Sequence, residues 1–151
     1  MDEYYLEFLK ELAYRLETYE DSTQWADWMK KSANKYENNS DLEYFESAFS
    51  GLGGFYDRYF YYSCITRSLS DIVCRIAKSL KENKDDTISS LLGEEKQRFV
   101  SFYESQGMTE YNSEELNFLN YLITNYKLGN LHNMTEKYEK EQKVNKKMQV
   151  L

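Results

Sequence analysis

Two features of the sequence limit the possible fold classes most strongly: the absence of proline and the spacing of the apolar residues. Proline is absent from all 151 residues, and valine and isoleucine, which favour strands, number only nine together. Between residues 2 and 20, apolar side chains recur at steps of four and three, which places them on one face of a helix. They are Tyr5, Leu9, Leu12, Leu16 and Tyr19. These features predict an all-α protein.

The same periodicity divides the rest of the chain into helices. We expect a single-domain bundle of about six helices, over residues 2–20, 23–37, 41–50, 55–82, 94–106 and 113–128. Residues 133–151 are almost wholly polar and rich in lysine, which leaves little apolar surface to pack. We therefore divide the chain into a helical domain, residues 1–132, and a mobile polar C-terminal tail, residues 133–151, that is either helical or frayed.

The formal net charge is −7 and is unevenly distributed. Residues 136–151 carry five lysines and three glutamates, a charge of +2 that leaves −9 on residues 1–135. This excess of carboxylates argues against direct nucleic-acid binding, because phosphates would be repelled. It favours a cationic protein partner through electrostatic steering, although an acidic surface also serves ordinary solubility. The 15 tyrosines also fit two interpretations: tyrosine packs at the margins of cores, and it is enriched in protein interfaces.

Three observations bear on the compartment. Cys64 and Cys74 lie ten residues apart on one expected helix, a separation of about 15 Å that is too long for a disulfide. The first residues do not have the pattern of a secretory signal, and no apolar stretch is long enough to span a membrane. We therefore expect a cytoplasmic protein with free thiols and no membrane contact, present as a monomer or a weak homodimer.

The residue types that usually carry catalysis do not form a known arrangement in this sequence. The only histidine, His132, has no companion ligand at the spacing of a zinc site, and neither cysteine has a histidine for a catalytic pair. Residues 51–54 are rich in glycine but lack the lysine of a phosphate-binding loop. We therefore expect no enzymatic activity, no metal and no cofactor.

Three of the six glycines cluster in residues 47–57, which read SAFSGLGGFYD. Glycine costs about 1 kcal/mol relative to alanine inside a helix, so the cluster marks a turn or a close approach of the backbone. We expect these glycines to turn the chain sharply against the helix that carries the two tryptophans, and Asp57 to cap the following helix. The residues of this expected junction are Trp25, Trp28, Gly51, Gly53 and Gly54.

With the preceding helix, this segment resembles a small bacterial domain family of unknown function. The family pattern is W-A-x-W followed by S-A-F-G-G-M-G-S-F-x-D; here residues 25–28 read WADW and residues 47–57 read SAFSGLGGFYD. The resemblance covers residues 6–62, and Ser50, Leu52 and Gly54 depart from the pattern. Such proteins resemble immunity proteins encoded beside secreted bacterial toxins, including contact-dependent inhibition and other polymorphic toxin systems. The resemblance implies an antitoxin that neutralises a cognate toxin, commonly a cationic nuclease.

An immunity protein of this kind would present carboxylates and aromatic anchors to the cations of its toxin. We expect the binding surface where acidic residues adjoin exposed aromatic ones. The candidate partner-binding residues are Asp41, Glu43, Tyr44, Glu46, Asp57, Tyr59, Tyr62, Asp85 and Asp86. Two alternatives stay open: an acidic inhibitor from a phage or host that mimics nucleic acid, and an enzyme that binds metal through carboxylates of residues 41–57. Helical spacing supports only Glu43 and Glu46 as a pair for such a metal.

Overall fold

The computed structural model describes residues 1–51, 53–109 and 113–150, with the side chains of residues 149 and 150 left out. Every regular element in these ranges is a helix. In chain order the helices are α1 (Asp2–Thr18), α2 (Thr23–Asn39), α3 (Glu43–Ser47), α4 (Tyr56–Tyr59), α5 (Cys64–Lys81), α6 (Ile88–Ser105), α7 (Glu114–Asn125) and α8 (Leu131–Val150). The predicted all-α class is confirmed. The described part of the chain holds eight helices rather than about six.

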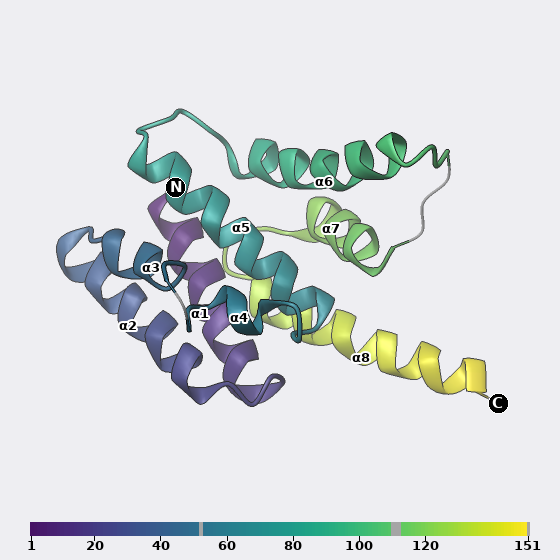
Figure 1. The fold of residues 1–151 in the computed structure, drawn as a ribbon. Helices are drawn as coiled ribbons and strands as arrows, with labels where there is room; N and C mark the ends of the chain where they lie inside the picture. Colours follow the sequence, from purple (N-terminus) through teal and green to yellow (C-terminus); the bar gives the residue numbers. More distant parts are fainter. Residues whose placement is uncertain (52, 110–112, 151) are drawn as a thin grey trace.

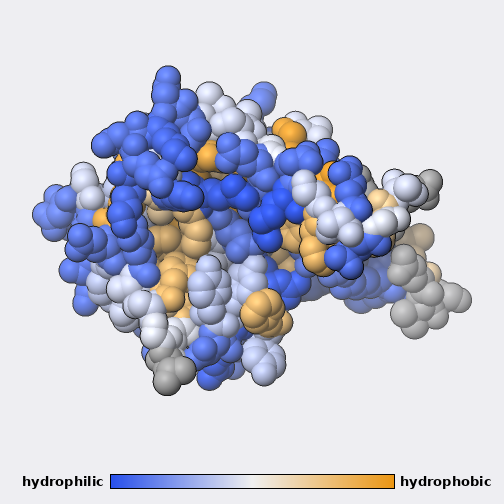
Figure 2. Space-filling view, turned by 45° about the horizontal axis from the view of Figure 1, so that its top comes forward, coloured by the Kyte–Doolittle hydropathy of each residue, from blue (hydrophilic) through white to orange (hydrophobic). Residues whose placement is uncertain are grey.

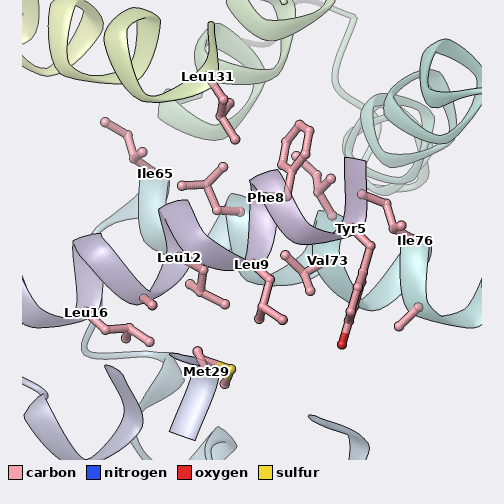
Figure 3. Packing of buried hydrophobic residues seen from close by; sticks show 14 of the residues in the cluster. Tyr5, Phe8, Leu9, Leu12, Leu16, Met29, Ile65, Val73, Ile76 and Leu131 are labelled. Atoms are coloured by element: carbon pink, nitrogen blue, oxygen red, sulfur yellow. The ribbon is translucent and has the colours of Figure 1, made fainter. Parts of the chain in front are cut away.

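Helix α1 is central to the bundle and packs on α2, α5 and α8 (Figure 1). Its buried apolar side chains recur every three or four residues, close to the expected pattern; the largest are Tyr5, Phe8, Leu9, Leu12 and Leu16. Figure 3 shows them among Met29 of α2, Ile65, Val73 and Ile76 of α5, and Leu131 of α8. Burying one such side chain stabilises by about 1.5–3 kcal/mol, so α1 holds α2, α5 and α8 to a common core.

The prediction of a single helix over residues 55–82 is wrong, because the structure has two helices there, α4 and α5. Ser63 has extended backbone angles, and its side chain accepts a hydrogen bond from the backbone N–H of Thr66, which begins α5 as an N-cap does. Just before it, Tyr62 is buried and its hydroxyl is 2.8 Å from that of Ser22, within hydrogen-bond distance. Tyr59 therefore ends α4, and residues 60–62 form a turn between two helices.

The expected domain limit at residue 132 is too early. Leu131, Met134 and Tyr138 of α8 belong to the hydrophobic core, and Glu139 pairs with the fully buried Arg15 of α1 at 3.3 Å. Beyond Lys140 the described side chains are exposed except for a half-buried glutamine, and α8 extends away from the other helices (Figure 1). The polar segment is thus helical, and its first two turns complete the core.

The glycine segment reverses the chain beside α2. Gly51 and Gly53 have φ angles of +79° and +78°, which side chains rarely allow. The turn brings the backbone N–H of Phe55 to the carbonyl oxygen of Ala48 at 2.7 Å and buries the Phe55 ring 5.7 Å from that of Trp25.

Asp57 does not cap α4 as expected. Its carboxylate accepts a hydrogen bond from the backbone N–H of Gly53 at 2.6 Å, and α4 has no side-chain cap. The carboxylate can reach back because Gly53 lies one turn before Asp57 along the chain. Asp57 therefore closes the glycine turn instead of the helix.

The positive φ angle assigned to Gly53 can be tested by comparing a glycine-to-alanine change there with the same change at Gly93. Gly53→Ala should lower the free energy of unfolding by about 1 kcal/mol, since an L-residue is strained at this φ although no atom lies within 4 Å of the added Cβ. The control, Gly93→Ala in α6, should raise it by about 0.5–1 kcal/mol because alanine favours a helix and Gly93 is also uncrowded. Urea unfolding followed by circular dichroism measures both. Effects of the same sign would contradict the assigned conformation of Gly53.

Candidate protein-binding surface

The most exposed large apolar side chains of the described residues are neighbours in sequence. Phe60 is 79% exposed and Tyr61 is 85% exposed, and Tyr56 on the same short segment is 50% exposed. We call residues 56–61, which comprise α4 and the start of the turn to α5, the aromatic segment. Single exposed apolar residues are common on proteins, but three within six residues mark a surface suited to contact.

A chain of ring contacts ties the aromatic segment to the core. The ring centroid of the buried Phe55 lies 5.3 Å from that of Phe49, and Phe49 lies 5.0 Å from Tyr56. Tyr56 in turn lies 5.6 Å from Tyr59, which lies 5.1 Å from Phe60. Aromatic pairs at these separations attract each other beyond simple burial. The exposed rings of Tyr56 and Phe60 are therefore supported by rings beneath them, which would reduce the entropy lost on binding a partner.

Polar groups behind the segment hold Tyr59 in place. Its hydroxyl donates to both carboxylate oxygens of Asp71 on α5, at 2.9 and 2.7 Å, and Arg98 of α6 donates to the same carboxylate at 3.0 Å. Burial raises the pKa of Asp71 to about 6, against the lowering effects of the Tyr59 hydrogen bond and the Arg98 charge. Phe60 and Phe99 line a hollow of about 400 Å³ beside this network.

A second hollow of about 560 Å³ lies between α3 and α5. Its floor is apolar, with Phe45, Phe49 and Cys74, and an ion pair between Glu46 and Lys81 at 2.8 Å stands among its lining residues. Figure 2 shows that apolar side chains lie in recesses between mainly hydrophilic parts of the surface. Phe49 contacts Tyr56, so this hollow adjoins the aromatic segment.

Most of the predicted acidic candidates have local structural contacts. Asp41 accepts hydrogen bonds from two backbone N–H groups at the start of α3, Glu46 pairs with Lys81, and Asp86 accepts from Ser79 at 2.8 Å. Glu43 and Asp85 are exposed. The structure brings Asp41, Glu43 and Glu46 together around α3, whereas Asp85 and Asp86 lie in the connection between α5 and α6.

The aromatic candidates are placed differently from one another. Tyr44 is half-buried and stacks on Trp28 with ring centroids 4.5 Å apart, and Tyr59 is half-buried against Asp71. The expectation that Tyr62 is exposed is wrong, because this residue is 5% exposed. Sequence reasoning missed Tyr56, Phe60 and Tyr61. The signal for them is the aromatic run itself, since four consecutive rings cannot all face one core.

One group of potential metal ligands occurs within the described residues. Glu11 of α1 and His132 and Glu136 of α8 each place a ligand atom within 4.8 Å of the others. Nδ1 of His132 lies 2.8 Å from Oε2 of Glu11. The sequence spacing around His132 matches no zinc motif, but the fold places two carboxylates beside it. Its carboxylate neighbour on α1 is 121 residues away, so no local spacing reveals it.

Comparison of the chain with protein-family models, with curated proteins and with solved structures gave no match. Among the described residues, no helix is both long and apolar enough to cross a membrane. Cys64 and Cys74 are free thiols, as the sequence predicts. Any function assigned to this chain therefore depends on its own residues and geometry.

Stability should respond to the ionisation of Asp71. Burial raises its pKa from 3.8 to about 6, so between these pH values the folded protein binds the proton more tightly than the unfolded chain. The resulting stabilisation is complete below pH 3.8 and is lost as the pH rises through 6. Relative to Asp71→Asn, the free energy of unfolding of the wild type should fall by up to about 3 kcal/mol from pH 4 to pH 7.

Urea unfolding of both proteins at several pH values measures this difference. Asparagine does not titrate and the remaining groups are common to the two chains, so the difference isolates Asp71. A difference that is constant or that increases with pH would contradict the buried environment assigned to this carboxyl.

Proposed function

We propose that this protein binds and neutralises a cationic partner protein, as an immunity protein does for its cognate toxin. The observation that carries the proposal is the pair of exposed aromatic residues, Phe60 and Tyr61, on an acidic protein. The ring of Phe60 contacts Tyr59 and, through it, the chain of rings that reaches the core. Binding residues of interfaces are enriched in aromatic side chains that are rigid and become fully desolvated. A surface of this type suits a stable protein complex better than the chemistry of an enzyme.

Charge supports the choice of a cationic partner. The body of the chain, residues 1–135, carries −9. Arg58 within the aromatic segment is exposed, whereas the two arginines behind the segment are paired, Arg67 with Glu115 at 2.9 Å and Arg98 with both Asp71 and Glu95. Their charges are compensated locally, so the carboxylate excess sets the long-range field that a partner meets.

The class of the partner is inferred from the sequence pattern. The resemblance of residues 25–28 and 47–57 to a bacterial family points to a secreted toxin, and a nuclease toxin carries the cations that bind nucleic acid. An acidic protein that covers those cations would occlude the substrate-binding site. The binding free energy would come from the aromatic anchors, and the acidic field would direct the encounter.

The aromatic contribution is tested with the double variant Phe60→Ser, Tyr61→Ser and the product of the adjacent toxin gene. We expect its affinity to fall about 30–1,000-fold, since two anchors are lost, and protection from the toxin to fall with it. The melting temperature should change little because both side chains are exposed. Calorimetric titration measures the affinity.

The matched control removes two exposed apolar side chains elsewhere. Val144 and Met148 on α8 are 55% and 68% exposed, so Val144→Ser, Met148→Ser also removes two exposed apolar side chains, away from the aromatic segment, and should bind normally. Full binding by a folded Phe60, Tyr61 double variant would place the interface elsewhere. No binding of the toxin by the wild type would reject the proposed function.

The electrostatic contribution predicts a change in association rate. Glu43→Lys with Asp85→Lys should lower the rate constant of association about 2–10-fold at low salt, with little change in dissociation, because both residues are exposed. Lys140→Glu with Lys147→Glu changes the net charge equally in the opposite direction and should raise that rate constant. Surface plasmon resonance at two salt concentrations measures both. Equal rates for the two variants would show that the partner is not cationic.

A further inference from the structure

His132 and Glu136 lie four residues apart on α8, which places their side chains on the same face of the helix. That face meets α1, whose Glu11 carboxylate lies 2.8 Å from Nδ1 of His132. The ligand atoms of the three residues lie within 4.8 Å of one another. Two helices distant in sequence thus present one imidazole and two carboxylates to a common point.

Glu11 has an incomplete set of partners. The residue is 4% exposed, and its Oε1 atom is buried without a hydrogen-bond partner among the described residues. A buried carboxylate oxygen in this condition costs free energy, and native proteins seldom leave one unsatisfied. The other oxygen, Oε2, faces the imidazole. A bound cation would provide the partner that the protein does not.

The surrounding charges leave a place for a dication. Arg15 is the nearest fixed cation on α1, and it pairs with Glu139 at 3.3 Å. The other nearby cation is Lys143, whose Nζ atom lies over the ring of Tyr19, 5.4 Å from the ring centroid. Arg15 is thus compensated by Glu139, and Glu11 and Glu136 bring two carboxylates to the same point. One divalent ion balances them.

Neighbouring tyrosines orient the two ligands on α8. The hydroxyl of Tyr19 lies 3.0 and 2.9 Å from the two carboxylate oxygens of Glu136 and donates to that group. The ring of Tyr14 meets that of His132 edge to face, with centroids 4.6 Å apart. Outer contacts of this kind fix ligand orientation in metal sites. The side chain of His132 is 52% exposed, so an ion and its water ligands can enter from solvent.

We propose that Glu11, His132 and Glu136 bind one zinc ion, or a similar transition-metal dication, between α1 and α8. Imidazole nitrogen with carboxylate oxygen suits Zn²⁺, whereas Mg²⁺ and Ca²⁺ prefer oxygen ligands alone. Three protein ligands leave a fourth position for water. The ion would join the first helix of the chain to the last and stabilise the docking of α8.

The test uses the full chain, freed of metal with a chelator and titrated with Zn²⁺. We expect one ion per chain and, at a hundredfold excess over the Kd, a rise in Tm of about 5–10 °C. Mg²⁺ at the same concentration should have no effect. His132→Gln and Glu136→Gln should each weaken zinc binding at least about tenfold while retaining the fold, since neither residue is buried.

Zinc also binds thiolates, so the cysteines require a control. Cys64→Ser, Cys74→Ser should bind zinc as the wild type does, and Co²⁺ bound to the wild type should show no charge-transfer band from a thiolate. Absence of a zinc-dependent rise in Tm for the wild type would overturn the site. An equal rise for His132→Gln, or loss of the rise in the cysteine variant, would also overturn it.

Discussion

The guanidinium of Arg15 lies on the central helix, is fully buried, and donates hydrogen bonds to Thr66 of α5 at 3.1 Å and Glu139 of α8 at 3.3 Å. Removing an ionised group from water costs several kcal/mol unless it is paired and hydrogen-bonded. The helices α1, α5 and α8 must therefore keep their positions for this charge to be satisfied. Loss of Glu139 would leave an uncompensated cation in the core, so the docking of α8 is coupled to the burial of Arg15.

The same network fixes the start of α5 and, through it, the aromatic segment. Arg15 also donates to Ser63, the N-cap of α5, and Glu20 accepts hydrogen bonds from the Ser63 backbone and the Thr66 hydroxyl. With Ser63 held in this way, Tyr62 turns inward to Ser22, and Tyr61, one residue earlier, points to solvent. The contacts of a buried charge thus help to fix which rings of the aromatic run are exposed.

Helical periodicity predicted the all-α class and placed α1 and α2 to within two residues of their observed ends, because their apolar faces are long and regular. It failed at residues 60–63, where aromatic residues are compatible with both helix and turn and only the cap at Ser63 separates them. It also underestimated α8. Leu131, Met134 and Tyr138 have helical spacing, but the polar and charged residues among them hid this short apolar face. The contact between Glu11 and His132 depends on tertiary packing and has no local signal.

The two parts of the proposed interface act at different stages of binding. Carboxylates such as Glu43 and Asp85 are exposed to solvent. They attract a cationic partner at distances up to about one Debye length, and they add little to the binding free energy when salt screens them. Phe60 and Tyr61 act only at contact, where their apolar area leaves water. Their separate roles explain why the acidic residues chosen from the sequence and the aromatic residues found in the structure need not coincide. In the proposed complex the field of the whole body would direct the partner, and the aromatic segment, held by α5 and the core, would determine how long that partner stays bound.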